Sequence, residues 1–179
     1  MSRAQTIFVG VAITVLATAT AASAARVNGA WTTFYPVGQP VTVSLPSSWQ
    51  NSQPSGHGEV FFAESPDAIS TLELLVSRYG APAAGFASDM ARRARQVYLA
   101  QDPHAVVRSR RVTVSAGNGL EVITSLVRRQ GSKSYPLSVE SYAFLRHGKI
   151  YEFVYLTLTP EAGEYFPVFD RSVHSIRFG

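Results

Sequence analysis

Short apolar runs and longer periodic stretches follow one another after residue 40, and they predict strands and helices in a definite order. Runs rich in β-branched and aromatic residues, bounded by turn-forming residues, predict eight strands, at 41–45, 59–63, 71–79, 105–115, 120–129, 139–145, 150–158 and 175–178. Apolar residues spaced three and four apart predict a helix over 83–101, with the buried stripe Phe86, Met90, Ala94 and Val97.

A second helix is expected directly after the strand over 150–158. Thr159, Pro160 and Glu161 are typical of a helix start, because they supply a capping hydroxyl, a residue that needs no N–H donor and a carboxylate in the first turn. An apolar stripe at helical spacing follows them, formed by Ala162, Tyr165, Phe166, Phe169 and Val173. We expect this stripe to pack on the sheet.

The predicted strand over 150–158 carries apolar residues on both of its faces. One face holds Ile150, Val154, Leu156 and Leu158, and the other holds Tyr151, Phe153 and Tyr155. A strand of this kind is covered on both sides, and runs of strands joined by short turns are typical of an antiparallel sheet. The sequence therefore predicts an α+β fold, a mainly antiparallel β-sheet sandwiched between helices in three α/β/α layers.

Residues 1–24 have the pattern of a signal peptide. Arg3 gives a positive start, an apolar run spans 7–16, and Ala22-Ser23-Ala24 is typical of a cleavage site. The apolar run covers about half of the roughly 20 residues that a membrane-spanning helix needs, which favours a cleaved signal over the alternative, an uncleaved membrane anchor. We predict an exported protein, periplasmic or extracellular, with an irregular lead-in over 25–40 and a single globular domain over 41–179.

Composition limits the chemistry that this domain can carry out. The chain has no cysteine, which excludes disulfides, thiolate metal sites and thiol catalysis. It is 46% hydrophobic, with 10 Phe and 8 Tyr, which suits a domain that relies on its core alone. The net charge of +4, which falls to +3 without Arg3, is too small to indicate nucleic acid. We expect no nucleic-acid partner and no stable membrane span once the signal is cleaved.

The strand and turn residues resemble those of the PsbP-like proteins and their relatives, the Mog-type Ran-binding proteins and the DcrB-like bacterial envelope proteins. The resemblance is carried by Val41 to Trp49, which is similar to the family's opening strand with its proline and tryptophan, by Phe61-Phe62, by Leu72 to Val76 and by the closing helix with Val173 to Phe178. It implies an antiparallel sheet between helices and a binding or assembly role without catalysis. The photosystem, metal and GTPase roles of individual members are not implied, because their functional residues are not recognisable here.

No catalytic, metal or cofactor motif is recognisable in the chain. Gly-x-Ser-x-Gly and Ser-x-x-Lys are absent, no two histidines lie at helical spacing, and no acidic loop has the spacing of a calcium site. We therefore predict no catalytic residue, no metal and no cofactor. The alternative is an enzyme whose site is assembled from isolated residues such as His57, Glu59 and His174.

A cluster of arginines is the candidate binding surface. With Asn118 and Gly119 as the turn of a hairpin, Arg108 lies opposite Arg129, and like charges in that position must find solvent or an anion. Arg110 follows on the same face. Arg92, Arg93 and Arg95 on the nearby helix could extend this patch, so the candidate site for an anionic partner comprises Arg92, Arg95, Arg108, Arg110 and Arg129.

The leading hypothesis is a non-catalytic exported accessory or binding protein whose partner is another envelope protein, a photosynthetic assembly or an anionic surface. The alternatives are a small-ligand carrier with an apolar pocket and an enzyme with an unrecognised site. An exposed groove of aromatic residues and arginines would favour the first reading, and an apolar cavity would favour the carrier. A cleft that holds a histidine and a carboxylate at hydrogen-bond distance would favour the enzyme.

Overall fold

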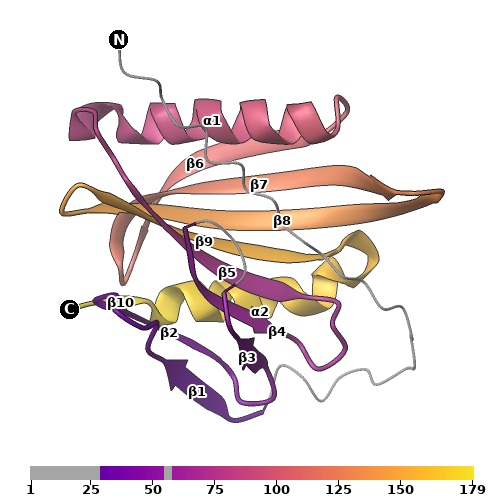
Figure 1. The fold of residues 1–179 in the computed structure, drawn as a ribbon, viewed down its shortest axis with the longest axis horizontal. Coiled ribbons are helices and arrows are strands. Elements are labelled where there is room, and N and C mark those ends of the chain that lie inside the picture. Colours follow the sequence, from indigo (N-terminus) through magenta and orange to yellow (C-terminus); the bar gives the residue numbers. More distant parts are fainter. Residues whose placement is uncertain (1–28, 55–57) are drawn as a thin grey trace.

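A curved sheet between two helices forms the body of the molecule (Figure 1). The computed structural model describes residues 29–54 and 58–179. Its strands are β1 (Trp31–Phe34), β2 (Val41–Pro46), β3 (Gln50–Ser52), β4 (Glu59–Glu64), β5 (Thr71–Arg78), β6 (Val106–Val114), β7 (Gly117–Gln130), β8 (Lys133–Arg146), β9 (Lys149–Leu158) and β10 (Arg177–Phe178). The helices are α1 (Phe86–Gln101) and α2 (Ala162–Ser175), and a short 3-10 turn precedes each of them, η1 (Ala83–Gly85) and η2 (Thr159–Glu161).

Antiparallel pairing connects all the strands of the main sheet. Its seven strands follow the order β3-β4-β5-β9-β8-β7-β6, and a smaller sheet has the order β1-β2-β10. The whole of β9 pairs with residues 137–146 of β8, and the two strands turn at His147 and Gly148. Both turn residues have positive φ, 48° and 71°, as a tight two-residue hairpin requires. The central position of β9 places this hairpin in the middle of the sheet.

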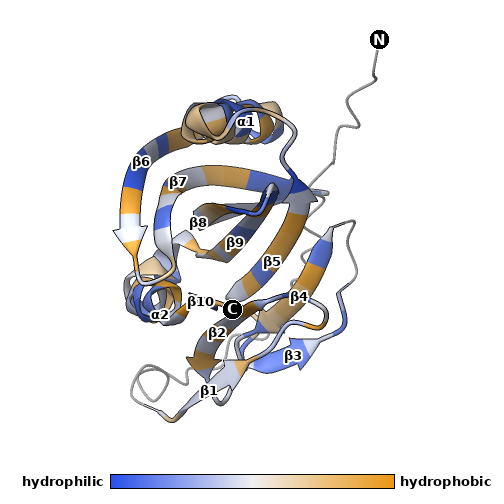
Figure 2. Cartoon of the chain, turned by 90° about the vertical axis from the view of Figure 1, so that its left-hand side faces the viewer, coloured by the Kyte–Doolittle hydropathy of each residue, from blue (hydrophilic) through white to orange (hydrophobic). Residues whose placement is uncertain are grey.

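The two helices cover opposite faces of the main sheet, as the two-sided pattern of β9 predicts (Figures 1 and 2). On one face, Phe86 and Met90 of α1 pack with Leu120 of β7 and Ile150 of β9. On the other face, an aromatic core joins α2 and β2 to the odd-numbered residues of β9. The ring centroids of Tyr155 and Phe169 lie 4.9 Å apart there. The predicted three-layer α+β arrangement is confirmed.

Part of the lead-in that we expected to be irregular is a strand. Residues 31–34 form β1, which pairs antiparallel with β2 so that Trp31 lies opposite Pro46. The ring of Trp31 packs under the guanidinium of Arg171 from α2, with 4.1 Å between the guanidinium carbon and the ring centroid. This strand forms because β2 offers an edge with which it can pair. Residues 25–40 themselves have no local pattern that predicts a strand.

The hairpin between β6 and β7 turns at Ser115 and Ala116, and not at the predicted Asn118 and Gly119. Val114 pairs with Gly117, so Gly119 lies inside β7. A side chain at Gly119 would approach the carbonyl oxygen and ring of the neighbouring strand to 2.8 Å, which explains why glycine stands there. Because the register differs, Arg108 lies opposite Ile123, and the predicted pairing with Arg129 is wrong.

The start of α2 differs from the expected cap. Thr159 belongs to η2, and no side chain caps either η2 or α2. The Thr159 hydroxyl instead lies 3.1 Å from that of Ser138 on β8, which ties the entry of the helix to the sheet.

In residues 29–54 and 58–179 no helix has the length and apolar character needed to cross a membrane.

Candidate ligand-binding site

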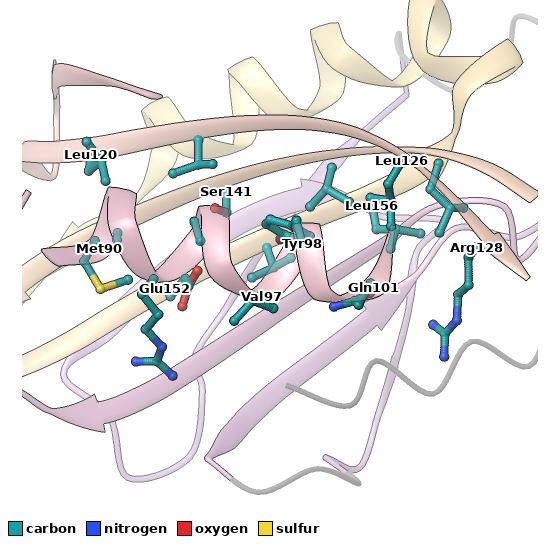
Figure 3. Close-up of a pocket in the computed structure, with 17 residues that line it drawn as sticks. Met90, Val97, Tyr98, Gln101, Leu120, Leu126, Arg128, Ser141, Glu152 and Leu156 are labelled. Atoms are coloured by element: carbon teal, nitrogen blue, oxygen red, sulfur yellow. The ribbon is translucent and has the colours of Figure 1, made fainter. Parts of the chain in front are cut away.

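A mainly apolar pocket lies between α1 and the sheet. It occupies about 760 Å³, the solvent at its open mouth included. Met90, Val97 and Tyr98 of α1 form one wall, and aliphatic side chains of β7, β8 and β9, such as Leu126 and Leu156, form the other. Met90 lies toward one end of the pocket and Gln101 and Arg128 toward the other (Figure 3).

Side-chain hydrogen bonds hold α1 over this pocket at both ends. At the start of the helix, the Tyr79 hydroxyl donates to Oδ2 of Asp89 at 2.9 Å, and its ring meets that of Phe86 edge-on. At the end, Oδ2 of Asp102 accepts the backbone N–H of Val127 on β7 at 2.8 Å. Bonds from backbone N–H groups lower the pKa of Asp102, so this tie is kept at neutral pH.

Besides Arg93, Gln101 and Arg128, the lining includes three polar side chains from the middle of the pocket, namely Glu152 on β9, Ser141 on β8 and Tyr98 on α1. Glu152 lies opposite Ala143 and Ser141 lies opposite Val154, so the two side chains are diagonal neighbours on one face of adjacent strands (Figure 3). Ser141 is 2% exposed. Within the described part of the chain, none of the three makes a side-chain hydrogen bond. Of the three, Ser141 is buried and Glu152 and Tyr98 are half-buried, and buried polar groups without partners are uncommon.

The surroundings of Glu152 disfavour its charged form. Burial raises the pKa of the Glu152 carboxyl, and attraction to Arg93 on α1 offsets only part of this effect. Burial likewise raises the pKa of the Tyr98 hydroxyl, with a further contribution from the nearby carboxylates of Glu152 and Glu73. Tyr98 therefore keeps its proton and can serve as a donor.

Glu73 extends this polar region beyond the pocket. It lies opposite Val154, on the face that α1 covers, and is 7% exposed. Burial raises the pKa of Glu73 to about 7, the Glu59 and Glu152 carboxylates contribute in the same direction, and Arg128 opposes them. Two acids and two arginines, Arg93 and Arg128, therefore surround one apolar pocket.

The arginines of the predicted patch are divided between the two faces of the sheet. Arg108, Arg110 and Arg129 point to the face that α2 covers, whereas Arg92 and Arg95 lie on α1. Arg110 is bound to a carboxylate: its Nε and Nη2 donate to the two oxygens of Glu121, with 2.9 Å for the bond from Nη2. Arg92 donates to Oδ1 of Asp89 at 2.7 Å. The five side chains do not converge on one surface.

The residues of the enzyme alternative are not assembled in the structure that can be described. His57 lies outside the described residues, and Glu59 opens β4. His174 lies in the last turn of α2, where its Nε2 is 3.6 Å from Oδ1 of Asp170. The pocket under α1 has a carboxylate in its lining and no histidine. Among the described residues, no group of three or more His, Cys, Asp or Glu is placed to hold a metal ion.

Sequence reasoning kept an apolar pocket as an alternative but did not locate it or its acid. The signal was Glu152 itself, the one charged residue on the face of the 150–158 strand that is otherwise formed by Ile150, Val154, Leu156 and Leu158. A charge in the middle of an apolar strand face indicates a functional group or a buried pair. Ser141 and Tyr98 gave no such signal, because only the fold brings them to the same place.

Comparison with known proteins relates the chain to others through its fold. No model of a protein family matches it, and no curated protein matches its sequence. Among solved structures, cyanobacterial PsbP (CyanoP) from Synechocystis sp. PCC 6803 is 11% identical, with a TM-score of 0.58 over 92% of this chain and 99% of that one. The Ran-binding protein Mog1p of Saccharomyces cerevisiae is 7% identical, with a TM-score of 0.58 over 84% and 96%.

A third similar structure is LpqN, which is involved in cell envelope biogenesis of Mycobacterium tuberculosis. It is 11% identical, with a TM-score of 0.56 over 82% of this chain and 89% of that one. These likenesses define the class: the chain has a PsbP/Mog1-like α+β fold over most of its length. At such low identities they establish the fold alone.

Proposed function

We propose that this protein is a non-catalytic exported binding protein and that the pocket under α1 is its binding site. The observation that carries the proposal is a mainly apolar pocket whose lining includes the buried Ser141 and the half-buried Glu152 and Tyr98, none of which makes a side-chain hydrogen bond among the described residues. Small-molecule sites are typically concave, mostly apolar and supplied with a few convergent polar groups. Of the three functions considered from the sequence, the small-ligand carrier fits this geometry best.

Binding of a neutral apolar dye such as N-phenyl-1-naphthylamine to the purified protein tests the pocket. Ala94 lines the pocket, whereas Ala100 lies on the exposed side of the same helix. We expect Ala94→Phe to fill the pocket and weaken dye binding by at least about tenfold, while Ala100→Phe leaves it unchanged. Equal dye binding by both variants and the wild type would place the dye elsewhere and contradict the proposal.

Export is supported by the signal pattern of residues 1–24. Expression in a bacterial host followed by cell fractionation tests it, with intact-mass measurement of the recovered protein. We expect the protein in the periplasmic fraction or the medium, cleaved after Ala24. Full-length protein in the cytoplasm would contradict export without bearing on the pocket.

A second candidate function is binding to an anionic surface, the partner class expected from the sequence. The outer part of the sheet face that α2 shares carries two exposed apolar residues, Val106 at 51% and Val127 at 42%, with Arg108 nearby on the edge strand β6. Arg108 has no ion pair within the described residues, whereas Arg110 is held by Glu121. This smaller patch of Val106, Arg108 and Val127 replaces the five-arginine patch as the surface to test.

Vesicles that contain phosphatidylglycerol provide the test of this second candidate. We expect Arg108→Gln to lower the affinity for such vesicles about two- to fivefold, because one exposed cation near an anionic surface contributes about 1 kcal/mol or less. Arg95→Gln, on the exposed face of α1, is the matched control. Equal losses for both variants would show that only net charge matters and would remove this patch as a site.

A further inference from the structure

The sheet face beneath α1 carries polar groups that the folded chain leaves without partners, in the pocket lining and next to it. Ser141 is 2% exposed and its hydroxyl makes no hydrogen bond among the described residues. Thr124, on the same face of neighbouring β7, is 1% exposed and its hydroxyl is also without a partner. The Glu152 carboxyl lies beside Ser141. Such groups are costly to bury, and a ligand that can hydrogen-bond to them removes that cost.

The charges around the pocket are balanced, which limits the ligand's own charge. Glu152 and Glu73 lie on the sheet side, and Arg93 and Arg128 lie at the lining from α1 and β7. An anionic ligand would meet the Glu152 and Glu73 carboxyls beside the arginines, and a cationic ligand would meet Arg93 beside the acids, so the balance of charge favours neither ion. Both ions would in addition lose their hydration on entering an apolar pocket.

We propose that the ligand is an electrically neutral, largely apolar molecule with a hydroxyl group, and that this hydroxyl binds at Glu152 and Ser141. This inference rests on the proposed function, because it concerns the same pocket. A hydroxyl suits the site since it can donate and accept, and so can pair with the Glu152 carboxyl in either protonation state and accept from the Ser141 hydroxyl or from Tyr98. The apolar body of the ligand then lies against Leu126 and Leu156, toward the Gln101 end.

Competition between matched ligands tests the inference. The ligands 1-octanol, octanoate and octylammonium share one apolar chain and differ in the head group, and each is titrated against bound N-phenyl-1-naphthylamine at neutral pH. We expect 1-octanol to displace the dye at a concentration at least about tenfold lower than either ion. Stronger displacement by octanoate or by octylammonium overturns the inference while leaving the binding pocket in place. Failure of the dye itself to bind contradicts the proposed function instead.

Variants of the two polar residues locate the head group. In Ser141→Ala and Glu152→Leu the preference for 1-octanol over octane should fall about fivefold or more, because a hydroxyl then loses one of its partners. Glu152→Gln should keep this preference, because the glutamine amide can still donate to and accept from a hydroxyl. Glu161→Gln, which removes a carboxylate on η2, is the control and should change none of these values. An unchanged preference for 1-octanol over octane in Ser141→Ala and Glu152→Leu, both shown to be folded by circular dichroism, would overturn the inference.

Discussion

The two faces of the main sheet both bury polar side chains, but only one face pairs them. On the face that α2 covers, Ser70 donates to Thr157 at 2.7 Å and the Tyr155 hydroxyl donates to Ser172 at 3.0 Å. On the face that α1 covers, the hydroxyls of Thr71 and Thr124 are buried without partners. Of the buried hydroxyls named on the main sheet, those on the α2 face are therefore paired and those on the α1 face are not, although the indole N–H of Trp31 in the small sheet beside α2 is also without a partner among the described residues.

The most elaborate pairing on the α2 face is centred on Tyr142. Its hydroxyl oxygen lies 2.9 Å from Oε1 of Glu121 and 2.6 Å from Oε1 of Glu140. A tyrosine hydroxyl has a single proton, so one of the two carboxyls must supply the second. Burial raises the pKa of Glu140, whereas Arg110 binds both oxygens of Glu121. We infer that Glu140 carries the proton and that the network is fully satisfied without a ligand.

Removing the centre of this network should have the largest effect on stability. Tyr142→Phe deletes two hydrogen bonds to carboxyl groups, each worth about 1.5–3 kcal/mol, and leaves both carboxyls buried. We expect the free energy of unfolding, measured by urea denaturation, to fall by about 3–5 kcal/mol. Tyr98→Phe on the α1 face is the matched control, and its expected change is below about 1 kcal/mol. Similar losses for both variants would contradict the distinction between the faces.

The layers of the fold could be predicted from the sequence, but the strand register and the side-chain contacts between segments could not. Alternation in 150–158 was sufficient to place a helix on each face, because a strand has only two sides. The prediction of the hairpin register was wrong at Gly119. This glycine lies inside β7, where it permits close packing against β8, and not in the turn. The binding site depends on which side chains of α1, β8 and β9 meet, as Ser141 and Glu152 do. Such contacts between distant segments have no local signature, and only the charge of Glu152 indicated the site.

The next largest effect concerns Glu73 on the α1 face and depends on pH. The pKa of this buried carboxyl is about 7 in the folded protein against an ordinary value of 4.5. The unfolded chain therefore releases its proton at lower pH, and stability falls as pH rises from about 4.5 to about 7. The difference corresponds to about 3 kcal/mol above pH 7. Glu73→Gln should abolish this fall. Its free energy of unfolding should exceed that of the wild type by about 3 kcal/mol at pH 8 and equal it at pH 4.

Denaturation curves measured between pH 4 and pH 8 provide the test for Glu73. Glu161→Gln removes a carboxylate from η2 and should keep the slope of the wild type. Parallel pH profiles for Glu73→Gln and the wild type would show that Glu73 ionises normally and that the α1 face tolerates its charge. A bound neutral ligand should leave the Glu73 effect in place, because Glu73 lies beside the pocket and not among its lining residues.

The smallest expected effect gives the most direct comparison, because one substitution can be made on each face. Thr124 and Thr157 are 1% and 0% exposed and face α1 and α2 respectively. Thr157→Val breaks the hydrogen bond from Ser70 and should destabilise the protein by about 1–2 kcal/mol. Thr124→Val removes a hydroxyl that has no partner, so we expect it to be neutral or to stabilise the protein by up to about 1 kcal/mol. Thermal and urea denaturation of both variants measure the difference, and a loss of stability in Thr124→Val equal to that in Thr157→Val would show that the two faces are equally complete.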